Sequence, residues 1–263
     1  MIMEAQPAVS KDLIPDKTIK KEPVIEITNV RKSFGEQEVL KDVSLTLYNG
    51  ENLVVLGKSG SGKSVLIKCI VGLLNADNGA IKVFDNNVAA LSRKDLGEVR
   101  QKIGFLFQSG ALYDSMTVKQ NLEFPLRRIK KDLSEKEIDE KVNEVLENVG
   151  LTDALLKMPS QLSGGMRKRI SLARSIIVDP LIMLYDEPTT GLDPATSEEI
   201  SSLINKVQET YKTSSLIITH DIKCAHNTAD RIIMLKDGEV YKEGAVDDFD
   251  QSTDPFITSF FKL

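Results

Sequence analysis

The sequence predicts an α/β fold: a parallel-sheet core with an antiparallel β subdomain near the N-terminus and an inserted α-helical subdomain. Strands that are buried on both faces need no alternation of polar residues. Three continuous apolar runs of this kind, which predict the parallel core, stand at residues 53–56, 182–185 and 216–219. Apolar residues alternate with polar ones at 43–48, as expected of half-buried antiparallel strands. Between the strand-rich regions, residues 134–150 have helical periodicity.

Strand signals begin at Pro23 and return near the C-terminus. Residues 1–22 mix Lys, Asp, Glu and Pro without periodicity, so we expect them to form a flexible tail. Residues 231–236 and 239–243 flank Asp237-Gly238, which favours a two-residue hairpin turn because both positions take positive φ. The apolar residues that mark the first strand are Val24, Ile25, Ile27 and Val30.

A capping box predicts where the main helix of the inserted subdomain begins. Glu137 follows Ser134 by three residues, and apolar residues then recur at helical spacing until Gly150 ends the helix. We therefore expect residues 23–263 to form one domain. Its expected parts are the core, about 23–108 and 176–263, and the helical subdomain, about 109–175.

The charge balance argues against a nucleic-acid partner. The 263 residues hold 34 Lys and Arg against 39 Asp and Glu, a formal charge of −5. A protein that neutralises nucleic-acid phosphates over a wide face needs a basic excess. The longest stretch without a charged residue, 103–113, is too short for a membrane-spanning helix, which needs about 20 residues. The N-terminus lacks the marks of a secretory signal or a transit peptide, so we expect the chain to stay in the cytosol.

The strongest chemical signal is the sequence GKSGSGKS at Gly57–Ser64. It fits the pattern G-x-x-x-x-G-K-[ST] between an apolar strand and a helix-like stretch, as a P-loop does. Backbone N–H groups can curl around phosphate oxygens, Lys63 supplies a mobile cation, and the Ser64 hydroxyl can ligate Mg²⁺. The core is therefore expected to be of the P-loop (RecA-like) type. The predicted nucleotide-binding residues are Gly57, Lys58, Ser59, Gly60, Ser61, Gly62, Lys63, Ser64 and Val65.

Two adjacent carboxylates end the apolar run at 182–185. Ligands collect at the carboxyl ends of parallel strands, where Asp186 suits the Mg²⁺ shell and Glu187 can orient and deprotonate an attacking water. The alternative is a strand that leaves the core through solvated acids. Because a P-loop is present in the same chain, we favour the catalytic interpretation.

A third motif, LSGGMRKR, stands at Leu162–Arg169. It resembles the signature motif of ATP-binding-cassette (ABC) ATPases. The family's other marks stand in order around it: GLDP at 191–194, and Gln108 and His220, each directly after a predicted strand. On these six ordered motifs, from the P-loop to His220, the chain is identified as a member of that family.

The resemblance implies that the protein hydrolyses ATP, with ATP and Mg²⁺ as cofactors. Phe34 takes the position of the family's adenine-stacking aromatic, although plain strand packing is the alternative. Gln108 would sense Mg²⁺ and the attacking water, and His220 would contact the γ-phosphate. The implied catalytic residues are Glu187, His220 and Gln108. The implied metal ligands are Ser64, Gln108 and Asp186.

The resemblance also implies a homodimer. Ser163, Gly164 and Gly165 would present a helix N-terminus to the γ-phosphate held by a second copy of the chain, and Asp193 would link the two sites. Met166 stands where many members have glutamine, which leaves the Ser and Gly contacts in place. A complete site would need two chains head to tail, so ATP binding would close the dimer and hydrolysis would reopen it.

A closer resemblance lies in FQSGALYDSMTVKQNLEFPLR at Phe107–Arg127, together with the SGGMRKR variant of the signature. These look like the ATPase subunit of MCE-type (Mla-like) phospholipid transporters. The implied partners are a membrane permease dimer and an MCE-domain lipid-binding protein, and the implied location is the cytoplasmic face of the bacterial inner membrane, as a peripheral subunit. The alternative for the apolar residues of this segment is to fill the core of the helical subdomain. The residues expected to dock the permease are Ala111, Leu112, Tyr113, Met116 and Val118.

Two other functions remain open. The ATPase of a small-solute importer, of the amino-acid type, would keep every catalytic motif and differ in the docking region. Residues 244–263 are too few for the regulatory domain that some importer ATPases append. A soluble cassette ATPase acting in translation or DNA repair would be expected to carry a second cassette or a long coiled-coil insertion. The C-terminal apolar segment, 255–263, is expected to pack on the protein's own core.

Overall fold

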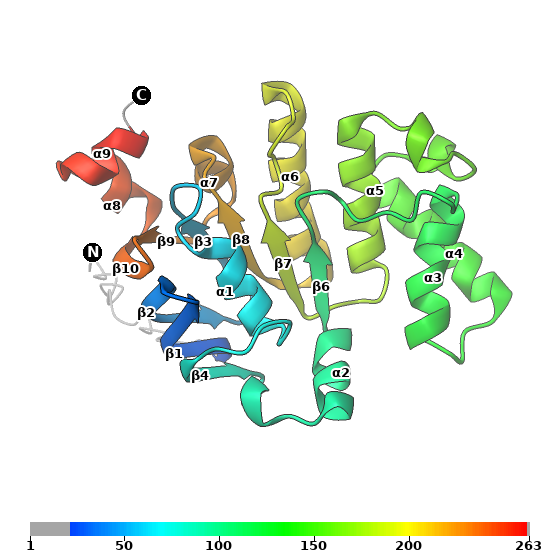
Figure 1. Cartoon of the computed structure of the whole chain (residues 1–263). Coiled ribbons are helices and arrows are strands. Elements are labelled where there is room, and N and C mark those ends of the chain that lie inside the picture. Colours follow the sequence, from blue (N-terminus) through cyan, green and yellow to red (C-terminus); the bar gives the residue numbers. More distant parts are fainter. Residues whose placement is uncertain (1–21, 262–263) are drawn as a thin grey trace, which may run out of the picture.

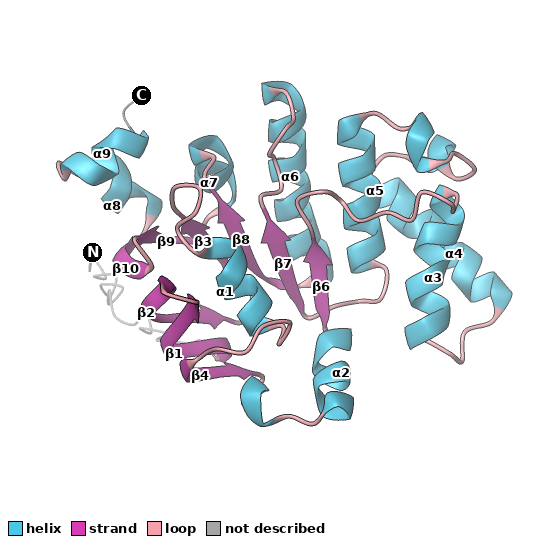
Figure 2. Ribbon diagram, in the orientation of Figure 1, coloured by secondary structure: helices cyan, strands magenta, loops and turns pink. Residues whose placement is uncertain are grey.

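The computed structural model describes residues 22–261, in which one ten-stranded sheet carries helices on both sides of its parallel half (Figures 1 and 2). The α/β class, with its antiparallel and helical additions, is confirmed. The predicted tail, residues 1–22, lies outside the described residues except for Glu22. The strand order across the sheet is β5-β4-β1-β2-β10-β9-β3-β8-β7-β6.

The antiparallel part of the sheet is built from the N-terminal strands, as expected. The alternation at 43–48 reflects a half-buried strand, because Val43, Leu45 and Leu47 are at most 5% exposed whereas Ser44 is exposed. Its strands are β1 (Pro23–Phe34), β2 (Gln37–Tyr48), β4 (Asn78–Val83) and β5 (Asn86–Asn87).

The parallel part contains the apolar runs, and every residue of three of its strands is buried. These three are β3 (Asn52–Leu56), β7 (Ile182–Asp186) and β8 (Ser214–Thr219). Beside them lie β6 (Ile103–Leu106), β9 (Arg231–Lys236) and β10 (Glu239–Gly244). The hairpin turn between β9 and β10 has positive φ at Asp237 and Gly238, as predicted.

The strand expected directly before Gln108 ends one residue earlier, at Leu106. The carbonyl of Phe107 accepts a hydrogen bond from the N–H of Gly110 at 3.0 Å, so the chain turns away from the sheet there. This turn starts the loop that carries Gln108.

Two hydrophobic cores lie on opposite faces of the sheet. Along β3, Leu53 and Val55 enter the core beneath α1, whereas Val54 and Leu56 enter the core beneath α5, α6 and α7. The helices that cover these faces are α1 (Lys63–Ile70), α2 (Arg93–Gln101), α5 (Gly164–Ile176), α6 (Pro194–Tyr211) and α7 (Ile222–Thr228). Short 3₁₀ turns stand at η1 (Val88–Ala90), η2 (Thr152–Ala154) and η3 (Pro159–Gln161).

The helical subdomain lies beyond the edge strand β6 (Figure 1). The expected capping box is present, because Ser134 Oγ accepts from Glu137 N and the Glu137 carboxylate accepts from Ser134 N. The helices grouped here with α5 are α3 (Val118–Ile129) and α4 (Glu135–Asn148). The boundaries expected for the subdomain remain a prediction.

The C-terminal segment packs on its own chain over the described residues, as expected. It forms α8 (Val246–Asp250) and α9 (Pro255–Phe261). Ile257 is 1% exposed, and Phe256, Phe260 and Phe261 pack against the same core as α6 and α7. Leu263 lies outside the described residues.

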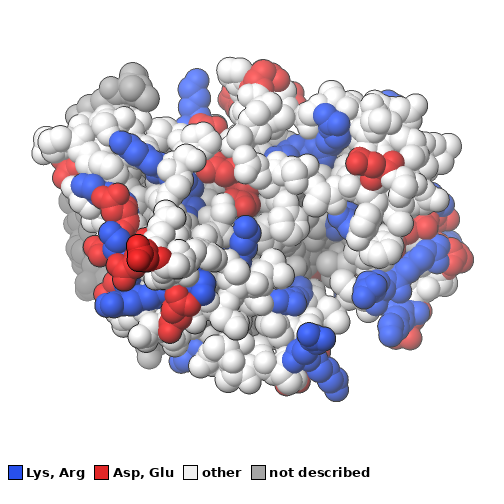
Figure 3. All heavy atoms as spheres, viewed as in Figure 1, with Lys and Arg blue, Asp and Glu red and all other residues white. Residues whose placement is uncertain are grey.

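Charged side chains are mixed on the viewed surface. Figure 3 shows basic and acidic groups interspersed, with a group of basic side chains at the lower right, over α3 and α4. Two of the basic side chains in this region are paired, Arg127 with Glu123 and Glu135, and Lys130 with Asp179. Within residues 22–261, no helix combines the length and apolarity that crossing a membrane requires.

A buried ion pair joins the two parts of the sheet. Glu51 lies in the turn between β2 and β3 and is 3% exposed. Its carboxylate accepts hydrogen bonds from Nε and Nη2 of Arg231 at 2.8 and 2.9 Å. Arg231 opens β9, and its Nη2 also donates to the Thr46 carbonyl of β2 at 2.6 Å. The pair therefore fixes β9 against the β2–β3 junction.

Replacing Arg231 with Met should lower the free energy of unfolding by about 3–5 kcal/mol, because Glu51 stays buried without its cation. Urea unfolding followed by far-UV circular dichroism measures the change. The control is Arg93→Met at the exposed start of α2, which should stay within about 0.5 kcal/mol of the parent. Equal losses in the two variants would contradict the assignment.

Candidate functional site

The P-loop turns sharply between β3 and α1. Gly60 and Gly62 have φ of 83° and 97°, which favour glycine. At Gly62 a side chain is also excluded by space, because a Cβ there would lie 2.8 Å from the Val39 carbonyl oxygen. The loop therefore closes against β2, and its residues form one wall of a cavity.

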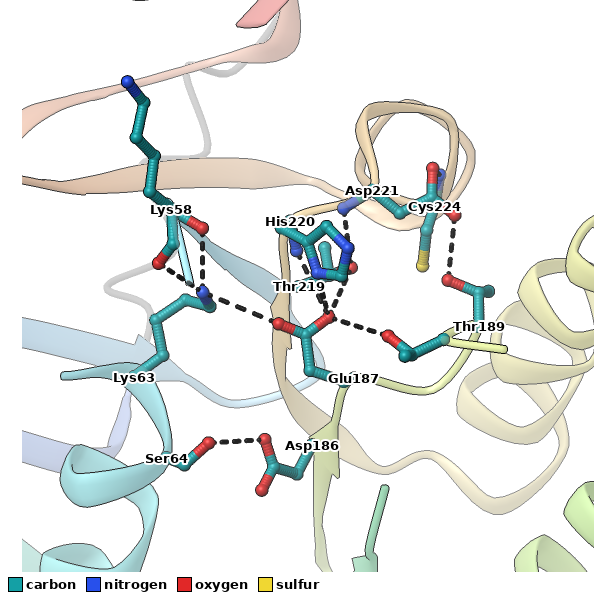
Figure 4. Close-up of polar contacts among 12 residues, drawn as sticks. Lys58, Lys63, Ser64, Asp186, Glu187, Thr189, Thr219, His220, Asp221 and Cys224 are labelled. Atoms are coloured by element: carbon teal, nitrogen blue, oxygen red, sulfur yellow. Dashed lines mark hydrogen bonds and ion pairs between the residues drawn. The ribbon is translucent and has the colours of Figure 1, made fainter. Parts of the chain in front are cut away.

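Lys63 lies inside the curl of the loop. Its Nζ donates to the carbonyls of Gly57 at 2.7 Å and Lys58 at 3.1 Å, and lies 3.5 Å from Glu187 Oε1 (Figure 4). Burial lowers the pKa of Lys63, and the carboxylates of Glu187 and Asp186 partly offset this shift. The amine is therefore a desolvated cation at the place where an anionic group would bind.

Ser64 and Asp186 meet from opposite sides of the site. Ser64 Oγ, in the first turn of α1, donates to Asp186 Oδ1, at the end of β7, at 3.0 Å. Burial raises the pKa of Asp186, and the hydrogen bond from Ser64 opposes the shift. A hydroxyl beside a half-desolvated carboxylate is an oxygen donor set that Mg²⁺ prefers, so these residues fit the ion.

Glu187 is held by donors on two sides. Its Oε2 lies 2.8 Å from His220 Nδ1, and it accepts hydrogen bonds from the His220 backbone N–H at 3.3 Å and from the Thr190 hydroxyl at 3.2 Å. The other oxygen, Oε1, faces Lys63 (Figure 4). The residue has φ of 51°, a strained value for a non-glycine residue. Such strain persists where surrounding contacts fix the backbone, as they do here.

Most of the predicted P-loop residues, with Gln108, Glu187 and His220, converge on a cavity of about 270 Å³, which Gly57, Lys58, Ser61 and Asp186 do not line. Gln108 is exposed on the loop after β6 and reaches this cavity. Phe34, at the end of β1, does not line this cavity; its side chain is 47% exposed, and the Lys32 ammonium lies over its ring at 5.5 Å from the centroid. The residues that line the cavity are Val39, Ser59, Gly60, Gly62, Lys63, Ser64, Val65, Gln108, Glu187 and His220.

The signature lies apart from this cavity. Ser163 caps α5, with its Oγ accepting from Met166 N at 3.2 Å, and Asp193 caps α6 by accepting from Thr196 N at 3.0 Å. Gly164 lines a second cavity, of about 430 Å³, which extends to Gln108. Among the described residues, neither the signature nor Asp193 borders the P-loop cavity.

The expected docking residues divide into two groups. Val118 is fully buried in the core of the helical subdomain, so its expected docking role is wrong: as the first residue of α3 it packs inward. Leu112 is half-buried and also packs against this core. Ala111 is exposed, Met116 is half-buried, and Tyr113 is 42% exposed with its ring 4.7 Å from the Arg174 guanidinium carbon.

Two polar residues that are buried in the structure, Asn121 and Lys168, were not among the predicted site residues. Asn121 is fully buried on α3. Its Oδ1 accepts from Tyr113 N at 2.8 Å, and its Nδ2 donates to the Met116 carbonyl at 3.1 Å, so the side chain holds the loop from Tyr113 to Met116 in place. Lys168, on α5, is 5% exposed. The sequence carries no local signal for either burial, because both depend on tertiary contacts and Lys168 stands between two arginines.

The sequence was also compared with known proteins. Residues 40–190 match the family model described as ABC transporter. The chain is 37% identical over 240 residues to the methionine import ATP-binding protein MetN of Campylobacter jejuni, covering 86% of this chain and 71% of MetN. It is 39% identical over 254 residues to the chloroplastic protein TRIGALACTOSYLDIACYLGLYCEROL 3 of Arabidopsis thaliana, covering 90% of this chain and 73% of that protein.

A solved dimeric structure has the same fold. The ATP-binding cassette MJ0796, in a post-hydrolysis state bound to ADP and Pi, aligns with a TM-score of 0.77 at 34% identity and covers 84% of this chain and 98% of that chain. ATP and Mg²⁺ are the cofactors of such cassettes, and the Ser64–Asp186 pair suits the metal. The chain therefore belongs to the ABC transporter family, as an ATP-hydrolysing cassette.

Proposed function

We propose that this cassette is the ATPase subunit of an MCE-type (Mla-like) transporter that moves phospholipid across the bacterial envelope through a membrane permease dimer. The observation that carries the catalytic part is the convergence of Lys63 and His220 on the carboxylate of Glu187. The lipid part rests on Phe107–Arg127, the segment that resembles lipid-transporter ATPases, and on the similarity to TRIGALACTOSYLDIACYLGLYCEROL 3, a relative named after a glycolipid.

Glu187 is the proposed general base. Lys63 holds one of its oxygens and His220 the other, so the carboxylate is fixed before ATP enters. The γ-phosphate then takes the contacts of Lys63, which leaves Oε1 of Glu187 free to orient and deprotonate water. Ser64 and Asp186, with Gln108, would hold Mg²⁺, which would neutralise charge at the phosphates.

The working unit is a head-to-tail homodimer. The capped N-terminus of α5, at Ser163, Gly164 and Gly165, does not line the P-loop cavity of its own chain. It is therefore proposed to complete the site of the second copy by donating to the γ-phosphate. Hydrolysis removes this shared contact, so the dimer opens. Asp193 caps the neighbouring helix α6 and is proposed to report this opening to the other site.

A permease is proposed to dock at the loop around Tyr113. Asn121 fixes the backbone of this loop, and the Tyr113 ring lies between Arg174 and Phe124, so the exposed aromatic face is rigid. A rigid aromatic on a polar rim is a favourable anchor. Through this contact the subunit would work at the cytoplasmic face of the inner membrane, as a peripheral protein, with an MCE-domain protein further along the lipid path.

The second candidate is the ATPase of an amino-acid importer. It is favoured by the similarity to MetN, which is named as a methionine import ATP-binding protein. The catalytic roles are the same in both candidates, so only the permease and its cargo distinguish them.

Replacing Glu187 with Gln should lower the ATP turnover rate by about 10²- to 10⁴-fold, the usual contribution of a general base. ATP-dependent dimers, measured by light scattering, should persist because no phosphate contact is removed. Glu98→Gln, on the exposed face of α2, is the matched control and should hydrolyse ATP at the parental rate. Near-normal turnover in Glu187→Gln would remove the assigned role.

Two inactive variants should complement each other if the sites are composite. Ser163→Arg blocks the signature, and Lys63→Ala removes the phosphate contact. A mixed dimer holds one intact site, so an equimolar mixture should regain turnover above that of either variant alone, with about a quarter of the parental rate as the upper bound. Turnover that stays at the level of the separate variants would contradict the head-to-tail arrangement.

The cargo can be tested by purifying the tagged chain from detergent-solubilised membranes and identifying the co-eluting proteins and lipids by mass spectrometry. A permease with an MCE-domain protein and phospholipid is expected. Tyr113→Ala should lose the permease, because its aromatic anchor is gone, whereas Tyr241→Ala, at an equally exposed tyrosine, should retain it. Co-elution of an amino-acid-binding protein would favour the second candidate.

A further inference from the structure

Lys168 is a buried lysine in the signature helix that the proposed catalytic roles do not use. Its Nζ contacts three backbone carbonyl oxygens: Gln108 at 2.7 Å, Phe107 at 3.3 Å and Glu187 at 3.4 Å. Two of these carbonyls follow β6 and the third follows β7. One side chain therefore connects α5 to the ends of two neighbouring strands, where Gln108 and Glu187 are attached.

The contacts use the full donor capacity of the amine. An ammonium group has three N–H donors, and three carbonyls receive them. Within the part of the chain that the structure describes, Lys168 forms no ion pair with a carboxylate, although Asp186 and Glu187 lie near enough to favour its charge. Burial lowers the pKa of Lys168 to about 8, so the group is mostly protonated at neutral pH.

The position of Lys168 along α5 matters. It lies four residues after Gly164, one helical turn below the N-terminus that carries the signature. A displacement of that N-terminus therefore moves Nζ with it, because a short helix segment moves as a rigid body. Two of the three carbonyls that Nζ holds belong to Gln108 and Glu187, the residues proposed to sense and activate the attacking water.

We propose that Lys168 is a positioning residue that couples the signature helix to Gln108 and Glu187 of the same chain. The signature of each protomer is proposed to engage the ATP held by its partner. Through Lys168, that engagement sets the backbone of the protomer's own general base, so each site hydrolyses ATP faster when the other site is filled. The inference rests on the roles proposed above for Glu187 and the signature.

The test compares two substitutions at this position. Lys168→Met keeps the apolar stem and most of the length of the side chain but removes all three donors, whereas Lys168→Gln keeps an N–H₂ donor on a side chain that is one bond shorter than lysine. Lys136→Met, at an exposed position of α4, is the matched control. The turnover rate, the Kd for a fluorescent ATP analogue and the melting temperature are measured for each full-length protein.

Lys168→Met should lower kcat by about 10- to 100-fold, since a displacement of about 1 Å at a reacting group can cost about 10²-fold. Its Kd for the ATP analogue should stay within about threefold of the parent, because the P-loop is untouched. Lys168→Gln should recover part of the lost turnover, and Lys136→Met should match the parent.

A double-mutant cycle tests whether Lys168 acts through Glu187. In single-turnover reactions, Lys168→Met should cost little more when Glu187 is already Gln, because the group it positions is gone. Independent, multiplicative losses would overturn the proposal, as would parental turnover in Lys168→Met. A parallel fall of kcat, ATP affinity and melting temperature in both substitutions would also overturn it, by showing a purely structural role.

Failure of the proposed function gives a different result. If Glu187→Gln alone keeps normal turnover, the general base is misassigned whatever Lys168 does. If Glu187→Gln is inactive while Lys168→Met is normal, the general base stands and the coupling role is refuted.

Discussion

Parallel pairing of β3, β8 and β7 is the constraint on which the site depends. The register places Leu56 opposite Thr219, and Asp186 opposite Ile218, so three strands end at one edge of the sheet. The P-loop, His220 and the acidic pair leave the sheet at that edge. No long-range folding of loops is needed to bring them together, because the backbone ladder between buried strands already does so.

Several elements could be predicted because their signals are local. The P-loop glycines, the capping box at Ser134 and the Asp237-Gly238 turn each specify backbone geometry over a few residues. Val118 could not be separated from Tyr113 in this way. Both are apolar residues in one loop-to-helix segment, and only the packing of α3 against α4 and α5 decides which of them is buried. Lys168 was missed for the converse reason: in the sequence it stands between two arginines, and its burial depends on tertiary contacts.

The site concentrates desolvated charge. Lys63, Lys168, Asp186 and Glu187 are each at most 9% exposed, and burial moves the pKa values of Lys63 and Lys168 down and that of Asp186 up. Burying charge costs free energy unless partners compensate, and here carbonyl dipoles and opposite charges do so. Two anionic phosphates and a divalent cation fit this arrangement because they interact with groups whose solvation has already been lost.

In the proposed head-to-tail dimer, the separation of the P-loop cavity from the signature would make each chain half of a catalyst. For a chain free in solution, specific activity must then rise with protein concentration, since a site exists only while two copies are associated. A permease dimer that binds one copy on each half replaces this bulk concentration with a local one, in the millimolar range for short tethers. Membrane attachment would thus act as an on-switch by proximity, so that cassettes without a transporter waste little ATP.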